Sequence, residues 1–88
     1  MNYHPLILRC VAVLAANHMI KGNKKPLDAW RKYPTEKRFT LLNDLWTSPA
    51  LVDQLACNDD ECEDMGGIVW CLSVGKEYYE AGNTRYRL

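Results

Sequence analysis

Four cysteines and two histidines are the residues of this 88-residue chain whose types allow the widest range of chemistry. Zinc sites typically use two close ligand pairs, and beyond Cys57 and Cys62 the chain has no second close pair. A redox bridge between these two cysteines stays open as an alternative. Cys10 and His18 would lie about 12 Å apart along a helix axis, too far for a thiol–imidazole pair. The pattern therefore predicts no metal site, no cofactor and no catalytic nucleophile.

Acidic residues crowd positions 59 to 64, which read Asp-Asp-Glu-Cys-Glu-Asp. A calcium-binding EF-hand loop needs acids at positions one, three and five, glycine at six and glutamate at twelve. Counted from Asp60, position three is Cys62, position six is Met65 and position twelve is Cys71, so the calcium pattern fails. The stretch is instead typical of a solvated helix start, where carboxylates stabilise the positive end of the helix dipole. An imitation of phosphates, directed at a nucleic-acid-binding partner, remains a hypothesis.

The chain also lacks the motifs of common enzyme classes. It contains no glycine-rich phosphate loop, no His-Glu-x-x-His sequence and no paired carboxylates in an apolar setting. A chain of this length forms one core and leaves no room for a cleft between two lobes. We therefore expect a protein that is not an enzyme.

Charge divides the chain into two halves although the formal net charge is zero. Residues 21–38 carry seven basic side chains and two acids, whereas residues 44–64 carry seven acids and no base. Such asymmetry steers partners of either sign, unless the two halves simply attract each other across the fold. The predicted partner-binding residues are Lys24, Lys25, Arg31, Lys32, Lys37 and Arg38 on a basic face, and Asp59, Asp60, Glu61, Glu63 and Asp64 on an acidic face.

Apolar spacing and capping residues predict helices throughout. The expected segments are 6–21, 26–33, 34–46, 49–57 and 59–81, with prolines opening several of them and Gly82-Asn83 ending the last. No run alternates in the manner of a strand, so we expect none. The predicted fold is an all-α orthogonal bundle of four to five helices with the long first and last helices at its centre. Residues 1–88 form a single domain, in which 83–88 are a short, frayed tail.

Small residues recur on one face of the predicted last helix, at Gly67, Cys71 and Gly75. Glycine inside a helix costs about 1 kcal/mol relative to alanine, so the repeat needs a compensating contact. Close packing on the alanines of the first helix is the favoured explanation. A seam between two copies in a homodimer is the alternative.

The function that these patterns favour is a non-enzymatic protein that binds and modulates or inhibits a protein or nucleoprotein partner. Small charge-polarised domains of this kind are typical of the accessory proteins that phages and mobile elements encode, which is an argument by analogy. The alternative is a nucleic-acid-binding regulator that uses the basic segment Lys21–Arg38, in which Trp30 and Tyr33 stand among the cations. No apolar run reaches the length of a membrane span, and we expect a cytoplasmic protein without membrane partners.

Overall fold

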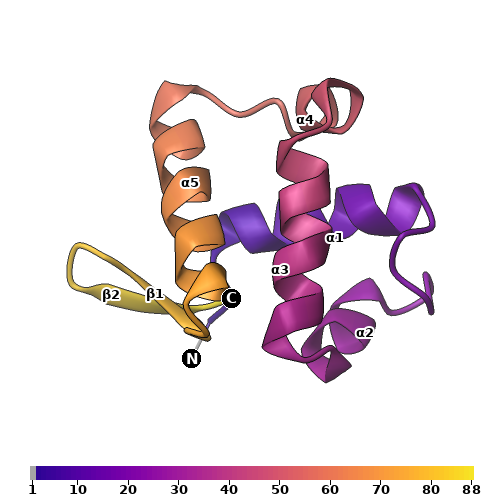
Figure 1. The fold of residues 1–88 in the computed structure, drawn as a ribbon, viewed down its shortest axis with the longest axis horizontal. Helices are drawn as coiled ribbons and strands as arrows, with labels where there is room; N and C mark the ends of the chain where they lie inside the picture. The colour runs from indigo at the N-terminus through magenta and orange to yellow at the C-terminus, as the bar shows by residue number, and fades with distance from the viewer. Residues whose placement is uncertain (1) are drawn as a thin grey trace.

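The computed structural model describes residues 2–88, which form five helices and one antiparallel hairpin (Figure 1). The elements in chain order are α1 (Pro5–Ala16), α2 (Pro26–Lys32), α3 (Thr35–Trp46), α4 (Pro49–Leu55), α5 (Asp59–Ser73), β1 (Tyr78–Ala81) and β2 (Thr84–Arg87). The prediction of a mostly helical fold is confirmed. The prediction of an all-α class is right in outline, but it misses the two-stranded sheet that follows α5.

The helices begin where capping chemistry predicts. Pro26 and Pro49 stand in the first turns of α2 and α4, where the missing N–H of proline costs nothing. Asn58 caps α5 in a reciprocal capping box with Glu61, since each side chain accepts a backbone N–H of the other residue. At the start of α1 the cap is His4, whose Nδ1 accepts the N–H of Leu6 at 3.1 Å. Local sequence therefore fixes the starts of these helices.

Helices α1 and α5 end well before their predicted bounds, because a residue in the left-handed conformation closes each of them, and α4 also ends early, at Leu55, before Ala56 with φ 51°. After α5, Gly75 has φ +82° and the N–H of Lys76 returns to the carbonyl of Cys71 at 2.8 Å. After α1, His18 has φ 58° and the N–H of Met19 returns to the carbonyl of Leu14 at 2.9 Å. Both ends are Schellman motifs, which satisfy the last carbonyls of a helix. The predicted extensions to positions 21 and 81 are wrong for this reason.

The C-terminal hairpin replaces the predicted end of the last helix and its frayed tail. Tyr78 pairs with Arg87 and Ala81 with Thr84, which leaves Gly82-Asn83 as a two-residue turn in which Gly82 has φ +61°. The tail is ordered because Leu88 is fully buried and its N–H donates to the carbonyl of Glu77 at 2.9 Å.

One hydrophobic core joins the helices, and α3 occupies its middle. Helix α3 packs on α1, α4 and α5, and α1 passes behind α3 in Figure 1. The predicted central pair of first and last helices is therefore wrong, since α5 packs chiefly on α3 and the hairpin. Among residues 2–88, no helix is both long and apolar enough to cross a membrane. The largest fully buried side chains are Trp30, Leu6, Ile7, Leu14, Ile20, Leu42, Leu45, Met65, Ile68 and Leu88.

Candidate functional site

A groove runs between the C-terminal half of α5 and the hairpin. Its volume is about 530 Å³ and its surface is mostly apolar. The residues that line it are Gly67, Trp70, Cys71, Lys76, Glu77, Tyr78, Tyr79, Glu80 and Arg85. We call it the Trp70 groove. Sites of this volume hold small ligands or the side chains of a partner.

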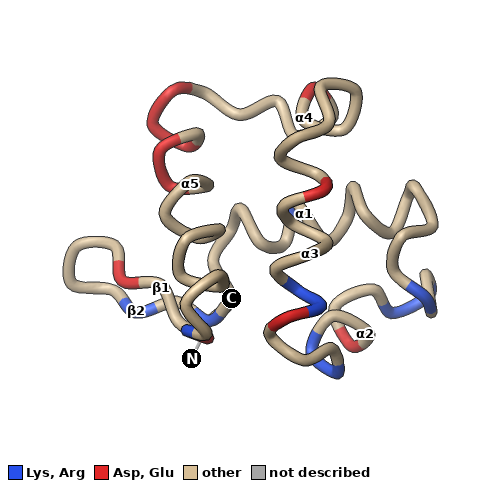
Figure 2. The backbone as a smooth tube through the Cα atoms, viewed as in Figure 1, with Lys and Arg blue, Asp and Glu red and all other residues tan. Residues whose placement is uncertain are grey.

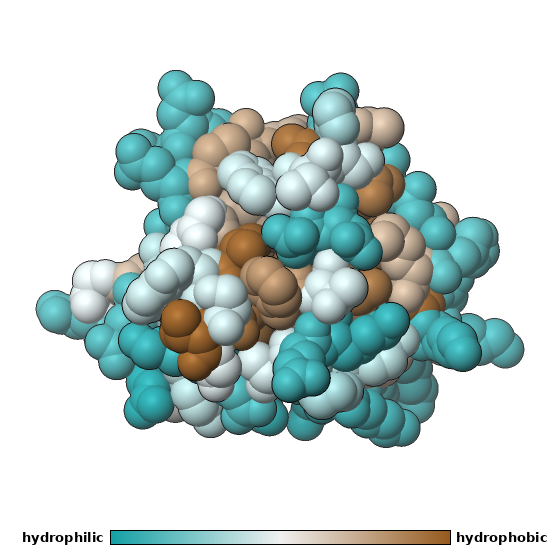
Figure 3. Space-filling view, in the orientation of Figure 1, coloured by the Kyte–Doolittle hydropathy of each residue, from teal (hydrophilic) through white to brown (hydrophobic). Residues whose placement is uncertain are grey.

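Trp70 gives this groove an exposed apolar rim. Its side chain is 58% exposed, and Val74, one helical turn later, is 53% exposed. Apolar surface is visible at this end of the molecule, near the base of α5 (Figure 3). Two cations stand over aromatic rings of the groove: Lys76 Nζ lies 5.3 Å from the centroid of Trp70, and Arg85 Cζ lies 4.3 Å from that of Tyr78. The groove is therefore equipped to bury apolar groups and to attract anionic ones.

A close contact between α5 and β1 forms the floor of the groove. A Cβ added at Gly67 would lie 2.9 Å from Cε2 of Tyr79, so glycine is what lets this ring approach the helix. The hydroxyl of Tyr79 donates to Asp64 Oδ1 at 3.0 Å. Burial and this negatively charged neighbour raise the pKa of Tyr79. The ring is thus pinned between Gly67 and Asp64.

The predicted ridge of Gly67, Cys71 and Gly75 does not exist as a helical face. Gly75 lies beyond the end of α5, and Gly67 packs on Tyr79 rather than on α1. Cys71 is buried in the core. Helix α1 meets α5 through larger side chains instead, since Cys10 Sγ lies 3.6 Å from Met65 Sδ.

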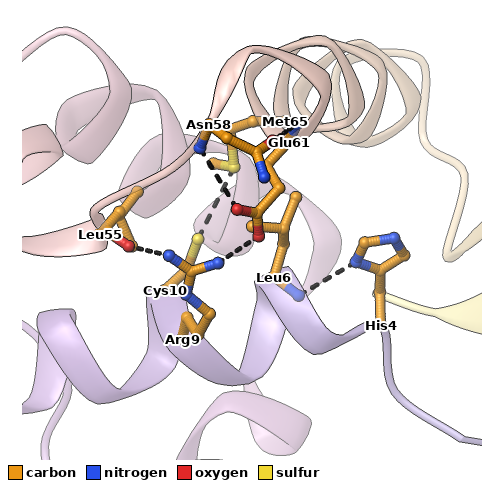
Figure 4. A network of polar contacts seen from close by, with 8 residues as sticks. All are labelled: His4, Leu6, Arg9, Cys10, Leu55, Asn58, Glu61 and Met65. Atoms are coloured by element: carbon orange, nitrogen blue, oxygen red, sulfur yellow. Dashed lines mark hydrogen bonds and ion pairs between the residues drawn. The ribbon is translucent and has the colours of Figure 1, made fainter.

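Two residues of the predicted acidic face, Glu61 and Asp64, form contacts within the protein. Glu61 forms an ion pair with Arg9, which also donates to the carbonyl of Leu55 and so ties α1 to α4 and α5 (Figure 4). Asp64 accepts the hydroxyl of Tyr79. Asp59, Asp60 and Glu63 remain exposed. The role of Arg9 is not predictable from the sequence, because nothing local in α1 shows that an acid of α5 lies beside it.

The predicted basic face keeps five of its six members. Lys24, Lys25, Arg31, Lys32 and Lys37 are exposed. The expectation that Arg38 is exposed is wrong: it is only 3% exposed, and its guanidinium donates to the carbonyls of Trp30 at 3.1 Å, Arg31 at 2.9 Å and Leu88 at 3.2 Å. Trp30 is fully buried beneath it and offers no ring for stacking a base.

The two charged halves lie at separate ends of the molecule. The acidic start of α5 and the basic residues around α2 occupy opposite corners of the view in Figure 2. Within the described part of the chain, the ion pairs are Arg9–Glu61 and Arg31–Asp28, and neither joins one half to the other. The explanation that the halves neutralise each other by direct contact therefore finds no support in the geometry.

The cysteines are all free thiols in this structure. Cys10 is fully buried, and burial raises its pKa to about 12, so its thiol is protonated at neutral pH. Burial also raises the pKa of Cys57. Across residues 2–88, no three His, Cys, Asp or Glu side chains converge as the ligands of a metal ion do. Cys10 and Cys57 lie outside the Trp70 groove, and Cys71 is the cysteine among its lining residues.

Of the residues that line the Trp70 groove, the sequence pattern predicts a role only for Gly67 and Cys71, and for a different contact, whereas Trp70 and the hairpin residues are not predicted. Gly82-Asn83 between two aromatic–polar segments is a hairpin signal as well as a helix stop, and the structure shows that the hairpin forms. No signal distinguishes exposed Trp70 from buried Trp30, since both follow helical spacing. No protein-family model, curated protein or solved structure matches this chain.

Proposed function

We propose that this protein is a non-enzymatic binding protein that engages a partner protein through the Trp70 groove and modulates it. The observation that carries the proposal is the 58% exposure of Trp70 on the rim of a mostly apolar groove. Tryptophan is among the residues that contribute most to binding free energy at protein interfaces. Trp70 and the exposed Val74 one helical turn later form an apolar patch beside the groove, and contiguous patches of this kind mark surfaces that a partner covers.

The charges around the groove and at the N-terminal end of α5 favour a protein as the partner. The lining holds the cations Lys76 and Arg85 and the acids Glu77 and Glu80, so its net charge is zero and does not attract a long polyanion, although neither cation is in an ion pair within the described residues. The exposed acids Asp59, Asp60 and Glu63 lie nearer the other end of α5, where they steer the approach of a basic surface.

A comparison of two exposed apolar residues tests the proposal. Tagged wild-type protein, Trp70→Ala and Leu8→Ala are used to capture proteins from a cell lysate at moderate salt. Leu8 of α1 is a matched control because it is also an exposed apolar side chain, at 44%, and does not line the groove. We expect a stoichiometric partner that the wild type and Leu8→Ala retain and that Trp70→Ala loses. The same set of proteins on all three would contradict the proposal.

Nucleic-acid binding is a second candidate, favoured by the exposed cluster of Lys24, Lys25, Arg31, Lys32 and Lys37 at one end of the molecule. Its test is the affinity for a labelled DNA duplex as salt is varied. The double variant Lys24→Ala, Lys25→Ala loses two phosphate contacts. The negative slope of log K against log salt therefore becomes shallower by about 1.8. Lys76→Ala, far from this cluster in the chain, is the control. A flat salt dependence of the wild type excludes this function.

A further inference from the structure

The hairpin has one covered edge and one open edge. On the outer side of β2, the N–H of His4 donates to the carbonyl of Arg87 at 3.1 Å, and the N–H of Arg87 donates to the carbonyl of Asn2 at 3.0 Å. Residues 2–4 therefore cover this edge as a short parallel segment. The N–H and the C=O of Arg87 therefore both point away from β1. Arg87 and its partner Tyr78 are thus a non-hydrogen-bonded pair of the antiparallel ladder.

The alternation of an antiparallel ladder then fixes the direction of the peptide groups of β1. Leu88 bonds to Glu77, and the next hydrogen-bonded pair is Tyr79 with Tyr86. Tyr78 and Glu80 consequently direct their N–H and C=O groups away from β2. Within residues 2–88 none of these four groups has a hydrogen-bond partner outside the hairpin. Strand β1 thus presents an open edge with two donors and two acceptors.

This open edge borders the Trp70 groove. Four successive residues, Glu77 to Glu80, line the groove. The face of a strand contributes alternate residues to a cavity, whereas its edge contributes successive ones. The groove therefore runs along β1 from Tyr78 to Glu80, and the exposed Trp70 of α5 and Arg85 of β2 also line it.

We propose that the groove takes an extended segment of the partner protein, which adds to β1 as a third strand of the sheet. The segment exchanges backbone hydrogen bonds with Tyr78 and Glu80 and places an apolar side chain against Trp70. Backbone bonds at a strand edge supply affinity in this mode of recognition, and pockets for alternate side chains supply specificity. The inference rests on the proposed function, since it names the form of the partner at the same groove.

Charge complementarity indicates that the segment also carries an acidic side chain. Lys76 and Arg85 have no acidic partner within ion-pair distance in the described part of the chain. The carboxylate of Glu77 is turned toward α3, where the hydroxyl of Thr35 donates to it at 3.5 Å. An acid beside the apolar residue of the segment would meet the two free cations.

A single-stranded nucleic acid fits the groove less well than a peptide. Arg85 stands 4.3 Å above the ring of Tyr78 and covers the face on which a base would stack. A sugar-phosphate backbone also lacks the regular alternation of donors and acceptors that the edge of β1 requires. We therefore treat nucleic-acid binding at this groove as an outcome that the test must exclude.

Random linear peptides displayed on phage, selected on the full-length immobilised protein, provide the probe. Enriched peptides are synthesised, their Kd is measured by fluorescence anisotropy, and each peptide N–H is methylated in turn. Strand addition predicts a loss of about tenfold at alternate positions only, because every second N–H of the segment faces β1. Uniform tolerance of methylation, or sensitivity at successive positions, overturns the proposal.

Two substitutions at one position link the effect to the edge of β1. Glu80→Pro removes the outward N–H without removing a ladder bond, a place where a strand tolerates proline. Glu80→Gln removes the charge and keeps the N–H. Since both variants lose the carboxylate, the comparison isolates the N–H, and we expect the peptides to bind Glu80→Pro about tenfold more weakly than Glu80→Gln. Unchanged binding to folded Glu80→Pro overturns the proposal.

If Glu80→Pro does not fold, amide hydrogen exchange on the wild-type protein tests whether the peptide adds to β1 as a strand. Strand addition predicts that the amides of Tyr78 and Glu80 exchange rapidly in the free protein and slowly with peptide. Absence of this protection, failure to enrich any peptide, or displacement of bound peptide by a short single-stranded RNA each overturns the proposal. A partner capture that depends on Trp70 but is unaffected by Glu80→Pro would leave the proposed function standing and remove the strand-addition mode alone.

Discussion

Arg38 is a charged side chain with a structural role. It donates to three backbone carbonyls, which come from the end of α2 and from the buried C-terminal Leu88. Burial lowers its pKa, yet an arginine stays charged at neutral pH. We expect Arg38→Met to lower the free energy of unfolding by about 2–4 kcal/mol, because the carbonyls lose a charged donor. Urea denaturation measures this change. The neighbouring exposed Lys37→Met is the control, with an effect within about 0.5 kcal/mol, and a similar loss in both variants would contradict the structural role of Arg38.

His4 makes the stability of the fold depend on pH. Burial lowers its pKa below 6.5 although Asp64 acts in the opposite direction, and its unprotonated Nδ1 caps α1. Below pH 6.5 the unfolded chain takes up a proton that the folded chain resists, so the free energy of unfolding falls as the pH falls, by at most about 1.4 kcal/mol per pH unit. His4→Asn keeps a capping acceptor and does not titrate. Between about pH 6.5 and 5, above the range of ordinary carboxyls, denaturation curves should show a smaller pH dependence in the variant; equal slopes would contradict the assignment to His4.

At the scale of elements, alanine substitutions at the adjacent Gly66 and Gly67 of α5 distinguish the effect of helix propensity from the effect of packing on the hairpin. A Cβ at Gly66 meets nothing within 4 Å, whereas a Cβ at Gly67 meets the ring of Tyr79 at 2.9 Å. Gly66→Ala should stabilise the protein by about 0.5–1 kcal/mol, because alanine is the better helix former. Gly67→Ala should not show this stabilisation, because its Cβ forces the ring of Tyr79 to move away from Asp64. Thermal unfolding of both variants measures the difference, and equal stabilisation would show that the hairpin does not depend on this contact.

The starts of the elements were predictable from sequence, and several of their ends were not. Proline and asparagine caps act within a single turn, so Pro26, Pro49 and Asn58 mark helix starts correctly. The end of α1 depends on His18 in a left-handed conformation, which local propensity disfavours outside glycine and which the tertiary packing must impose. The hairpin was missed because its strands are only four residues long and carry mixed polar and aromatic side chains.

The candidate site was less predictable than the fold for a related reason. Whether a tryptophan is buried, as Trp30 is, or exposed, as Trp70 is, depends on where neighbouring elements pack. The same holds for charge, since Arg38 is buried while Lys37 beside it is exposed. Sequence patterning located the two charged halves of the chain. It does not show which of their members the fold uses internally, because those contacts join residues 15 to 52 positions apart in the chain.

At the scale of the whole molecule, the separation of charge makes a neutral protein strongly dipolar. The extents of the molecule are 33 × 26 × 20 Å and the formal net charge is zero, with acidic and basic groups gathered at different ends. The Trp70 groove lies at the hairpin, near the C-terminal end of α5, and the exposed acids lie at the N-terminal end of that helix. Under the proposed function, the dipole would orient an approaching partner and the groove would supply the short-range contacts.

This dipole predicts attraction between copies of the protein at low ionic strength. The screening length is about 30 Å at 0.01 M salt, comparable with the size of the molecule, and falls to about 8 Å at 0.15 M. The second virial coefficient from light scattering should accordingly be negative at low salt and rise as salt is added. A variant with Lys24→Glu, Lys25→Glu, Asp60→Lys and Glu63→Lys keeps the net charge at zero while weakening both poles, and it should lose most of this attraction. Attraction that persists in this variant, or that salt does not weaken, would instead assign self-association to an uncharged surface such as the open edge of β1.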